Sequence, residues 1–286
     1  MPKPTTLVAG ATGTLGRAIV AELARRHHRV RALSRRDTPV PGATEVVRGD
    51  LNDMTSLEHA CAGVDAVVSA AGASLSLGLR PRSATFEAVD RDGTLRLIVA
   101  AQAARVRRFA YVSVFHTPEQ ADMAYVRAHV DAERALHTST LDPVVVRPTG
   151  FFDALTPLLT MARLGVAPRL GGGTARSNPI ATEDLAVVVV DALEAGTPLV
   201  EAGGPDVLTR TEMFEAAFGA VGRKPRFVPT SPRVIELNAR LVRPVDRRLS
   251  DLLRFFARVS TTDCVAPARG VRQLSAYFTR LAAVPE

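Results

Sequence analysis

Three glycines near the start of the chain, Gly10, Gly13 and Gly16, separate a short apolar run, residues 5–9, from a segment with helical periodicity. An anion that approaches the backbone closely needs turn residues without Cβ and free N–H groups at a helix start. The pattern therefore predicts a strand, a phosphate-binding turn and a helix, as dinucleotide sites have. A tight turn packed against a helix can require the same glycines. The predicted contacts in this turn are Gly10, Thr12, Gly13, Thr14, Leu15 and Gly16.

The end of the next apolar run indicates which dinucleotide binds. Residues 30–33 have strand character and lead into Ser34, Arg35 and Arg36, and the first acid, Asp37, follows both arginines. An acid here would accept from a ribose 2′-hydroxyl, whereas the arginine fork suits a 2′-phosphate. We therefore expect NADP(H) to be preferred over NAD(H). The alternative is a pair of solvated arginines in an arginine-rich chain.

Strands and helices alternate along the chain. We predict further strands at residues 45–48, 65–69, 109–114 and 144–147, and helices at about 55–62, 85–105 and 121–138. Connecting helices of this length imply a parallel sheet covered on both faces, which is a doubly wound α/β (Rossmann) fold. Ligands of such sheets lie at the carboxyl ends of the strands. We expect a dinucleotide-binding core at residues 1–150 and a smaller, mostly helical substrate-binding region at residues 151–286, interleaved with the core.

Residues 183–195 carry conflicting signals. Their four valines favour a strand, but Thr182 is a good helix cap and Gly196 a good helix end. Glu183 and Asp184 also suit the first turn of a helix, where the helix dipole favours negative charge. We therefore predict a helix with Thr182 as its N-cap.

The chain of 286 residues has a formal charge of +7, which suggests a nucleic-acid partner. Lysine occurs only at positions 3 and 224, so the charge is arginine spread along the chain, and aromatic residues make up only 5%. Little remains for stacking on bases, and we expect no nucleic-acid partner. The arginine-rich segment at residues 232–259 is expected to form a solvent-facing helical surface, with an anionic partner or an oligomer interface as alternatives.

Other partners are limited by what the sequence lacks. No apolar run approaches the roughly 18 to 20 residues that cross a bilayer, and residues 1–4 lead into the first strand without a signal-like segment. We expect a cytoplasmic protein without a membrane partner. Cys61 and Cys264 are too few for a disulfide framework or a metal site, so we expect two unpaired buried thiols and no bound metal.

Together these features resemble the short-chain dehydrogenase/reductase superfamily, specifically its atypical, NmrA-like branch of NAD(P)-binding proteins. The likeness covers nearly the whole chain, through residues 10–16, Arg35, 49–51, 70–72, 89–95, 111–113, 146–148, 179–180 and 184–186. The resemblance implies a position for each part of the cofactor. By the resemblance, Asp50 and Leu51 hold the adenine, Ala70, Ala71 and Gly72 line the central path, and Pro148, Thr149, Gly150 and Phe151 approach the nicotinamide.

The resemblance also implies a catalytic set. Typical members use a serine, a tyrosine that donates a proton to the carbonyl oxygen, and a lysine four residues later that binds ribose and lowers the tyrosine pKa. Ser113 and Tyr125 match this pattern, but His129 stands in place of the lysine. Tyr125 and His129 share one helix face. A neutral imidazole cannot lower the pKa of a phenol as an ammonium does.

Two mechanisms follow for an enzyme. In the first, Tyr125 donates the proton, His129 holds the ribose or relays from solvent, and Ser113 orients the oxygen. In the second, the protein only positions the nicotinamide against an activated acceptor, and water protonates the product. Tyr125 and His129 are otherwise packing residues, and His116 is a further titratable candidate without an assigned partner.

We expect an NADP(H)-dependent reductase of a small apolar carbonyl, enone or quinone-like acceptor. The acceptor class rests on Leu75, Leu77 and Leu79 and on Phe151 with Phe152, which suit an apolar floor. The alternative is a non-catalytic NADP(H)-binding sensor of NmrA-like type that contacts a protein partner, which the missing lysine favours. A homo-oligomer fits either function.

Overall fold

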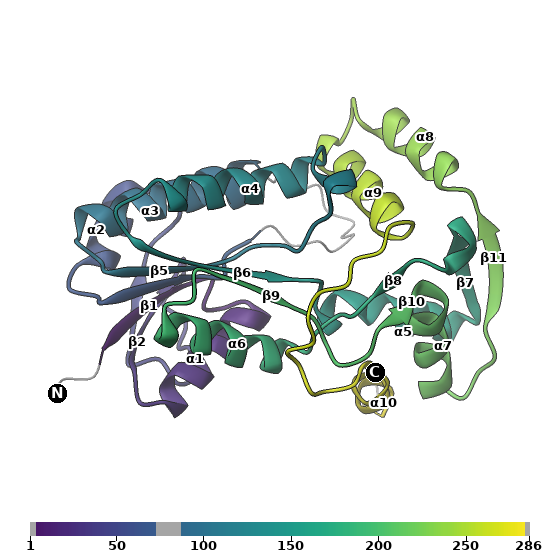
Figure 1. Cartoon of the computed structure of the whole chain (residues 1–286), viewed down its shortest axis with the longest axis horizontal. Coiled ribbons are helices and arrows are strands. Elements are labelled where there is room, and N and C mark those ends of the chain that lie inside the picture. The colour runs from purple at the N-terminus through teal and green to yellow at the C-terminus, as the bar shows by residue number, and fades with distance from the viewer. Residues whose placement is uncertain (1–3, 73–86, 284–286) are drawn as a thin grey trace.

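A parallel sheet forms the larger half of the molecule (Figure 1). The structure is a computed structural model that describes residues 4–72 and 87–283. Seven strands lie in the order β3-β2-β1-β4-β5-β6-β9, so the order reverses between β1 and β4, where such sheets bind ligands. The strands are β1 (Thr5–Ala9), β2 (Arg29–Ser34), β3 (Glu45–Arg48), β4 (Ala66–Ser69), β5 (Arg108–Val112), β6 (Asp142–Pro148) and β9 (Leu199–Ala202).

Helices cover both faces of this sheet. Figure 1 shows α1 (Thr14–Arg25) and α6 (Thr182–Ala195) on one face, and α2 (Met54–Cys61), α3 (Thr94–Ala103) and α4 (Ala124–His137) on the other. Successive strand residues point to opposite faces, so Val8 joins the core under α1 and α6, while Leu7 joins the core under α2 and α3. The predicted doubly wound α/β fold is confirmed.

The helix predicted at residues 85–105 differs from the observed one. The described part begins with a π-helix, Glu87–Gly93, and continues as the regular helix α3. Asp90, within the wide turns, is 1% exposed. Wide turns of this kind are frequent at functional sites.

Helix α6 is confirmed, but its predicted cap is wrong. Ala181 occupies the N-cap position without a side-chain cap, and Thr182 is the first helical residue. The Thr182 hydroxyl donates to the Asp153 carboxylate instead, so a tertiary contact displaces the local one. Gly196 ends the helix in the left-handed conformation with φ of 69°, as predicted.

The C-terminal lobe is more mixed than the predicted helical region. Its helices are α5 (Thr156–Leu164), α7 (Arg210–Ala220), α8 (Pro232–Val242), α9 (Arg247–Val259) and α10 (Leu274–Ala282), with short 3₁₀ turns at Phe152–Leu155 and Gly171–Gly173. Its strands pair as β7 (Val166–Leu170) with β11 (Arg226–Thr230), and β8 (Arg176–Ser177) with β10 (Leu208–Thr209). Phe152, Phe218 and Phe278 lie in its core. Helix α6 and strand β9 follow residue 150 yet complete the sheet layer, so the two regions interleave.

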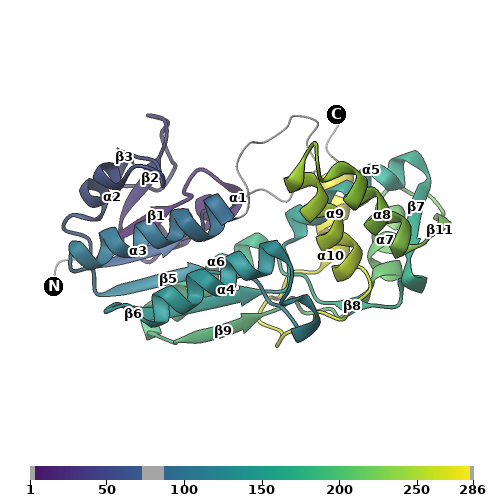
Figure 2. The same cartoon turned by 90° about the horizontal axis from the view of Figure 1, so that it is seen from above.

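One pair of helices joins the lobe to the sheet layer. Helix α9 packs against α4, and α8 packs on the far side of α9 (Figure 2). A further 3₁₀ turn, Pro118–Gln120, precedes α4. The carboxyl edge of the sheet therefore lies beside this helical pair.

Candidate functional site

The glycine turn after β1 is shaped by close backbone contacts. Gly10 has φ of +82°, and a Cβ there would lie 2.7 Å from the backbone of Ala70 on the neighbouring strand end. A Cβ on Gly16 would overlap the carbonyl oxygen of Gly10. Gly10 and Gly16 are therefore needed for the turn itself, which holds the start of α1 against the strand end.

The N-terminus of α1 is open to an anion. Gly13 is the N-cap without a side-chain cap, and no acid lies in the first turn. Thr12, Gly13 and Thr14 are exposed, whereas Leu15 is buried in the core under α1. Of the predicted turn contacts, Leu15 therefore offers only its backbone. The free N–H groups and the dipole of α1 suit a pyrophosphate.

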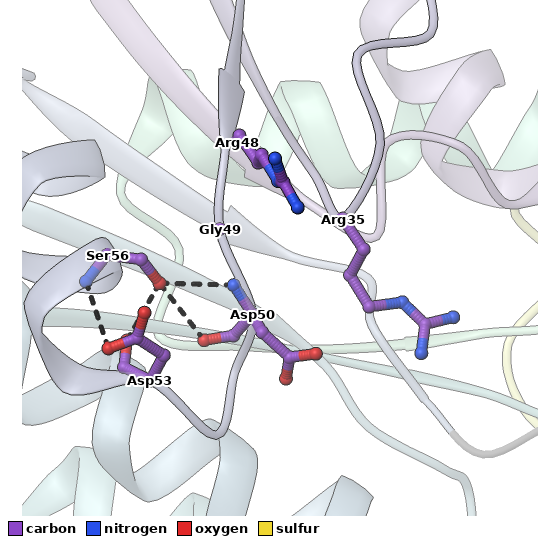
Figure 3. Close-up of a pocket in the computed structure, with 6 residues that line it drawn as sticks. All are labelled: Arg35, Arg48, Gly49, Asp50, Asp53 and Ser56. Carbon is purple, nitrogen blue, oxygen red and sulfur yellow. Dashed lines mark hydrogen bonds between the residues drawn. The ribbon is translucent and has the colours of Figure 1, made fainter.

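A cavity of about 460 Å³ lies at the ends of β2 and β3, on the same carboxyl edge of the sheet as this turn. Its lining residues, which we call the β2–β3 pocket, are Arg35, Arg48, Gly49, Asp50, Asp53 and Ser56. Figure 3 shows Arg35 and Arg48 on one side of the Asp50 backbone, with Asp53 and Ser56 on the other. The parallel register places Ser34 opposite Arg48, so the two arginines come from adjacent strand ends. Neither arginine forms an ion pair with a described residue.

Short-range hydrogen bonds hold the acidic side of the pocket. The Ser56 hydroxyl accepts from the Asp50 backbone N–H at 3.1 Å, and Asp53 caps α2 by accepting from the Ser56 backbone N–H (Figure 3). One carboxylate oxygen of Asp50 accepts from the Asn52 backbone at 2.9 Å. A Cβ on Gly49 would meet Leu33 at 2.7 Å. The loop is thus preformed, and the other Asp50 oxygen remains for a ligand.

Ser34 and Arg36 shape the turn that presents Arg35. The buried Ser34 hydroxyl donates to the Arg36 carbonyl at 2.7 Å and accepts from the Arg36 backbone N–H at 3.2 Å. Arg36 itself is exposed and outside the pocket lining. Sequence reasoning missed Arg48, whose signal was its place at the end of the third strand, next to the strand that ends at Ser34.

The predicted central path follows β4. Ala70 abuts the glycine turn, and a Cβ on Gly72 would lie 3.1 Å from the Asp90 carboxylate. The Leu51 side chain packs against Gly93 in the π-helix and on the core under α2 and α3. The expected lid leucines, Leu75, Leu77 and Leu79, lie outside the described residues.

Residues after β6 lead from the sheet into the C-terminal lobe. Pro148 ends β6, and the Thr149 hydroxyl donates to the Asn178 carbonyl at 2.6 Å. Gly150 has φ of +140°, and Phe151 pairs with Ile180 through a β-bridge. Phe151 packs on the core under α6.

The sequence suggested that Phe151 and Phe152 form an apolar floor together, and this prediction is wrong for Phe152. It is 2% exposed, belongs to the core of the lobe, and stacks near Tyr277 with ring centres 5.4 Å apart. A 3₁₀ turn begins at Phe152, so the two adjacent phenylalanines point in different directions and pack in different cores.

Tyr125 and His129 belong to one group, which we call the His129 cluster: the buried Tyr111 and His129 and the partly buried His116 and Tyr125. The Tyr111 hydroxyl lies 2.6 Å from Nδ1 of His129, and the Tyr125 ring packs edge-on at 4.7 Å. Burial, with His116 adding to it, lowers the His129 pKa to about 4, although Glu133 opposes the shift. His129 is therefore neutral at neutral pH and cannot supply the positive charge of the usual lysine.

Tyr125 is placed against the lobe. Its ring contacts Phe255 of α9 at 4.9 Å and joins Ala128, Leu252 and Phe256 in a small apolar cluster, with part of its surface still exposed. Burial, and then the Asp90 charge, raise the Tyr125 pKa. The phenol is a weaker acid here than in water.

Ser113 is also engaged. Its hydroxyl donates to Glu133 on α4, and Glu133 pairs with Arg147, whose Nε donates at 3.0 Å. Burial of a carboxylate is tolerated because the pair is hydrogen-bonded on both sides. Sequence reasoning missed Glu133, although it follows His129 by one helical turn and so shares its face.

Ring nitrogens in the His129 cluster lack partners. His129 Nε2 and both ring nitrogens of His116 are buried without a hydrogen-bond partner among the described residues. Such groups are costly unless something else satisfies them. Across the described ranges, no three His, Cys, Asp or Glu side chains gather as a metal site requires. Cys61 and Cys264 are free and buried, as predicted.

Comparisons with known proteins agree with this geometry. A family model described as NAD(P)H-binding matches residues 10–195. A ceramide reductase of Caulobacter vibrioides is 34% identical over 238 residues, which cover 77% of this chain and 72% of the relative. The chloroplastic divinyl chlorophyllide a 8-vinyl-reductase of Zea mays is 29% identical over 255 residues, which cover 81% of this chain and 63% of the relative.

The solved structures add a match of fold. An NADPH-dependent quinone oxidoreductase from Escherichia coli, complexed with NADPH, superposes with a TM-score of 0.74 at 18% identity, covering 96% of this chain and 99% of that chain. The chain spans 59 to 63% of the length of the first curated relatives it matches. In the part of the chain that the structure describes, no helix is long and apolar enough to cross a membrane. One relative is chloroplastic, so the cytoplasmic location stays a prediction.

Proposed function

Because this chain belongs to the NAD(P)H-binding family, we propose that it is an NADP(H)-dependent oxidoreductase that reduces a small apolar carbonyl, enone or quinone-like acceptor. The observation that carries the proposal is the pair Arg35 and Arg48. They have no ion-pair partners among the described residues and line the β2–β3 pocket, on the same edge of the sheet as the glycine turn. Two cations beside an anion-binding helix end suit a ligand with phosphates at both places.

Each part of the cofactor has a proposed position. The turn at Gly10 and the N-terminus of α1 would hold the pyrophosphate, and Arg35 with Arg48 would hold the 2′-phosphate. The free oxygen of Asp50 would accept from the adenine amino group. Ala70 to Gly72 and then Pro148 to Phe151 lie along the remaining carboxyl edge of the sheet, toward the nicotinamide.

The preference for the phosphorylated cofactor follows from charge. The described residues that line the pocket include two acids, but Asp53 caps α2 and one carboxylate oxygen of Asp50 accepts from Asn52. The arginines face the cavity from the strand ends, where a 2′-phosphate would lie. An arginine fork binds phosphate with two hydrogen bonds, which a 2′-hydroxyl cannot match.

The chain's own residues position the reaction. When bound, the reduced nicotinamide supplies a hydride to the acceptor. The His129 cluster lies near this end of the sheet, where the Tyr111 hydroxyl contacts His129 and Glu133 accepts from the neighbouring Ser113. Side chains held in place by such hydrogen bonds would orient an acceptor against the nicotinamide.

We propose that water protonates the product. Tyr125 has a raised pKa and no lysine beside it, and the Ser113 hydroxyl is bonded to Glu133. Activated acceptors such as quinones and conjugated enones need little acid assistance once the hydride arrives. Relatives whose names describe vinyl and quinone reduction support this acceptor class, and the ceramide relative indicates that an apolar substrate suits the family.

The test is a fluorescence titration of the purified chain with NADPH and NADH, followed by a panel of quinones, enones and aldehydes with absorbance measured near 340 nm. We expect tighter binding of NADPH and acceptor-dependent loss of absorbance. Binding of neither cofactor would refute the proposed site, and equal affinity for both would refute the role of the arginines.

The geometry of the His129 cluster also favours a second candidate, a non-catalytic NADP(H) sensor. A neutral His129 and a Tyr125 packed against α9 are what a chain without acid catalysis would show. The sensor predicts tight NADPH binding with no consumption by any acceptor in the panel. Steady turnover with one of these acceptors excludes it.

A further inference from the structure

Helix α8 carries apolar side chains on two separate faces. Ile235, Ala239 and Val242, spaced four and three residues apart, lie on one face, and Ala239 is fully buried where α8 packs on α9. A second set lies on the other side of the helix. Val234, Leu237 and Leu241 have exposed fractions of 52%, 56% and 68%, and their spacing of three and four residues makes one stripe. A helix that only packs on a neighbour needs one apolar face.

This exposed stripe continues past the helix. Val245, in the link between α8 and α9, is 92% exposed. Figure 1 shows α8 at the outer edge of the lobe. We call Val234, Leu237, Leu241 and Val245 the α8 stripe. Its four side chains form an exposed apolar surface.

Arginines border the α8 stripe. Arg233 and Arg240 are exposed and two helical turns apart, so they form a line along one side of it, and exposed Arg243 follows the helix end. None of the three has an ion-pair partner among the described residues. Residues 232–259 hold seven arginines and three acids, so the helical pair is basic as a whole.

We propose that the α8 stripe binds the surface of an anionic lipid bilayer, with α8 lying in the plane of the interface. Apolar side chains enter the boundary between headgroups and acyl chains, while flanking arginines pair with lipid phosphates. A second copy of the chain fits less well, because a symmetric contact through this face would bring each arginine line toward its own copy.

Binding at a surface is compatible with the lack of a spanning helix. The sequence-based expectation of no membrane partner rested on the absence of a long apolar run, which bears on crossing a bilayer and not on lying along it. Helix α9 joins the α8 stripe to the His129 cluster, since Phe255 contacts Tyr125 at 4.9 Å. A docked chain would therefore hold its candidate reaction site close to the lipid.

The test is co-sedimentation of the full chain with vesicles of phosphatidylcholine alone and of phosphatidylcholine mixed with phosphatidylglycerol. We expect binding to the anionic vesicles only, weakening as salt rises. Leu237→Ser with Leu241→Ser should weaken binding by roughly tenfold or more, because two exposed leucines lose their burial in lipid. Arg233→Gln with Arg240→Gln should weaken it by about fivefold per arginine.

Matched controls change the same chemistry elsewhere. Val207→Ser with Val271→Ser removes exposed apolar side chains, and Arg29→Gln with Arg269→Gln removes exposed arginines, all outside the α8–α9 pair. Unchanged binding in the controls supports the α8 stripe. An equal loss in the controls overturns it, as does wild-type chain that fails to bind anionic vesicles at low salt.

Two further readouts separate the alternatives. If Leu237→Ser with Leu241→Ser converts a dimer into a monomer without vesicles, the stripe is an interface between copies, and the lipid proposal is overturned. NADPH affinity should be the same in all these variants, since none lies in the proposed cofactor site. The lipid proposal and the proposed function therefore fail independently.

Discussion

The β2–β3 pocket and the His129 cluster both lie at carboxyl ends of strands of the sheet, but they are built in opposite ways. In the pocket, Arg35 and Arg48 are exposed and have no ion-pair partners among the described residues. In the cluster, Tyr111 and His129 are buried and bonded to each other. The pocket therefore exposes two positive charges that can bind an anion, whereas burial keeps His129 of the cluster uncharged at neutral pH.

This difference separates binding from chemistry. Exposed cations over a preformed loop favour a multiply charged ligand without requiring the protein to change. A buried neutral imidazole and a phenol of raised pKa are poor acids and bases at neutral pH, but they pack well. The chain therefore has strong structural support for holding a dinucleotide and weak support for tyrosine-based acid catalysis.

The largest expected effect comes from the turn that supports the pocket. Gly16→Ala places a methyl group on the Gly10 carbonyl oxygen, so the turn must open. We expect a loss of roughly 2 to 3 kcal/mol of unfolding free energy and loss of measurable NADPH binding. Urea unfolding and fluorescence titration measure the two effects.

Gly219→Ala is the matched control for this turn. It lies in α7, and an added Cβ would meet nothing within 4 Å. The same substitution there should leave NADPH binding unchanged and stabilise the helix slightly. If Gly16→Ala binds NADPH normally, the turn does not hold the cofactor.

The next effect tests the neutral state of the cluster. Burial lowers the His129 pKa from 6.5 to about 4, so between these values the unfolded chain binds a proton that the folded chain does not. Stability is then fully present above pH 6.5 and falls as the pH drops toward 4, by at most about 3 kcal/mol. Urea unfolding of the wild type across this range measures the slope.

His129→Gln provides the comparison, because its amide oxygen can still accept from Tyr111 but cannot titrate. Carboxylates elsewhere lose stability in acid in both proteins, so the difference between the two curves isolates His129. Parallel curves would mean that His129 is charged in the folded protein, and the contrast between the two regions would be lost.

The sequence predicts the glycine turn and the strands, but it does not predict all the residues of the pocket and the cluster. The glycine turn and the strands of the sheet are local patterns, in which a few adjacent residues specify both conformation and burial. Arg48 was missed because its place in the pocket depends on the register of two strands. The bond from Tyr111 to His129 depends on the packing of α4 over β5, and no spacing in the sequence reports it.

The C-terminal lobe shows the same limit. The parallel pairing of β7 with β11 joins segments that are far apart in the sequence. The periodicity of the neighbouring helices carries no information about such a pairing. Phe152 follows Phe151 directly, yet the 3₁₀ turn between the sheet and α5 carries it into another core. The local sequence favours Thr182 as a helix cap, but its hydroxyl donates to Asp153, a contact between residues distant in the sequence.

A smaller effect tests whether the arginines of the β2–β3 pocket determine the cofactor preference. Arg35→Gln with Arg48→Gln removes two positive charges beside the proposed 2′-phosphate but keeps amide donors there, so we expect a total loss of about 1.5 to 3 kcal/mol of binding free energy. We expect NADPH affinity to fall at least tenfold and NADH affinity to stay within about twofold. Parallel titrations with both cofactors measure the ratio.

Arg36→Gln is the control for these arginines. Sequence placed Arg36 beside Arg35, but the pocket lining omits it. Its replacement should leave the ratio of affinities unchanged. A shift as large as that of the double variant would move the phosphate site out of the β2–β3 pocket.

The smallest expected effect is the most decisive for the chemistry. Tyr125→Phe removes a hydroxyl whose pKa is raised by burial and keeps the ring against Phe255. If water protonates the product, kcat with the best acceptor should stay within about twofold of the wild type, whereas loss of a general acid costs about a hundredfold or more. Tyr277→Phe, which removes a hydroxyl bonded to Asp153 and Thr156 in the lobe, controls for the loss of a tyrosine hydroxyl. A large loss of kcat confined to Tyr125→Phe, with NADPH affinity unchanged, would make this phenol the acid despite its burial, and the two ends of the site would then both be chemically active.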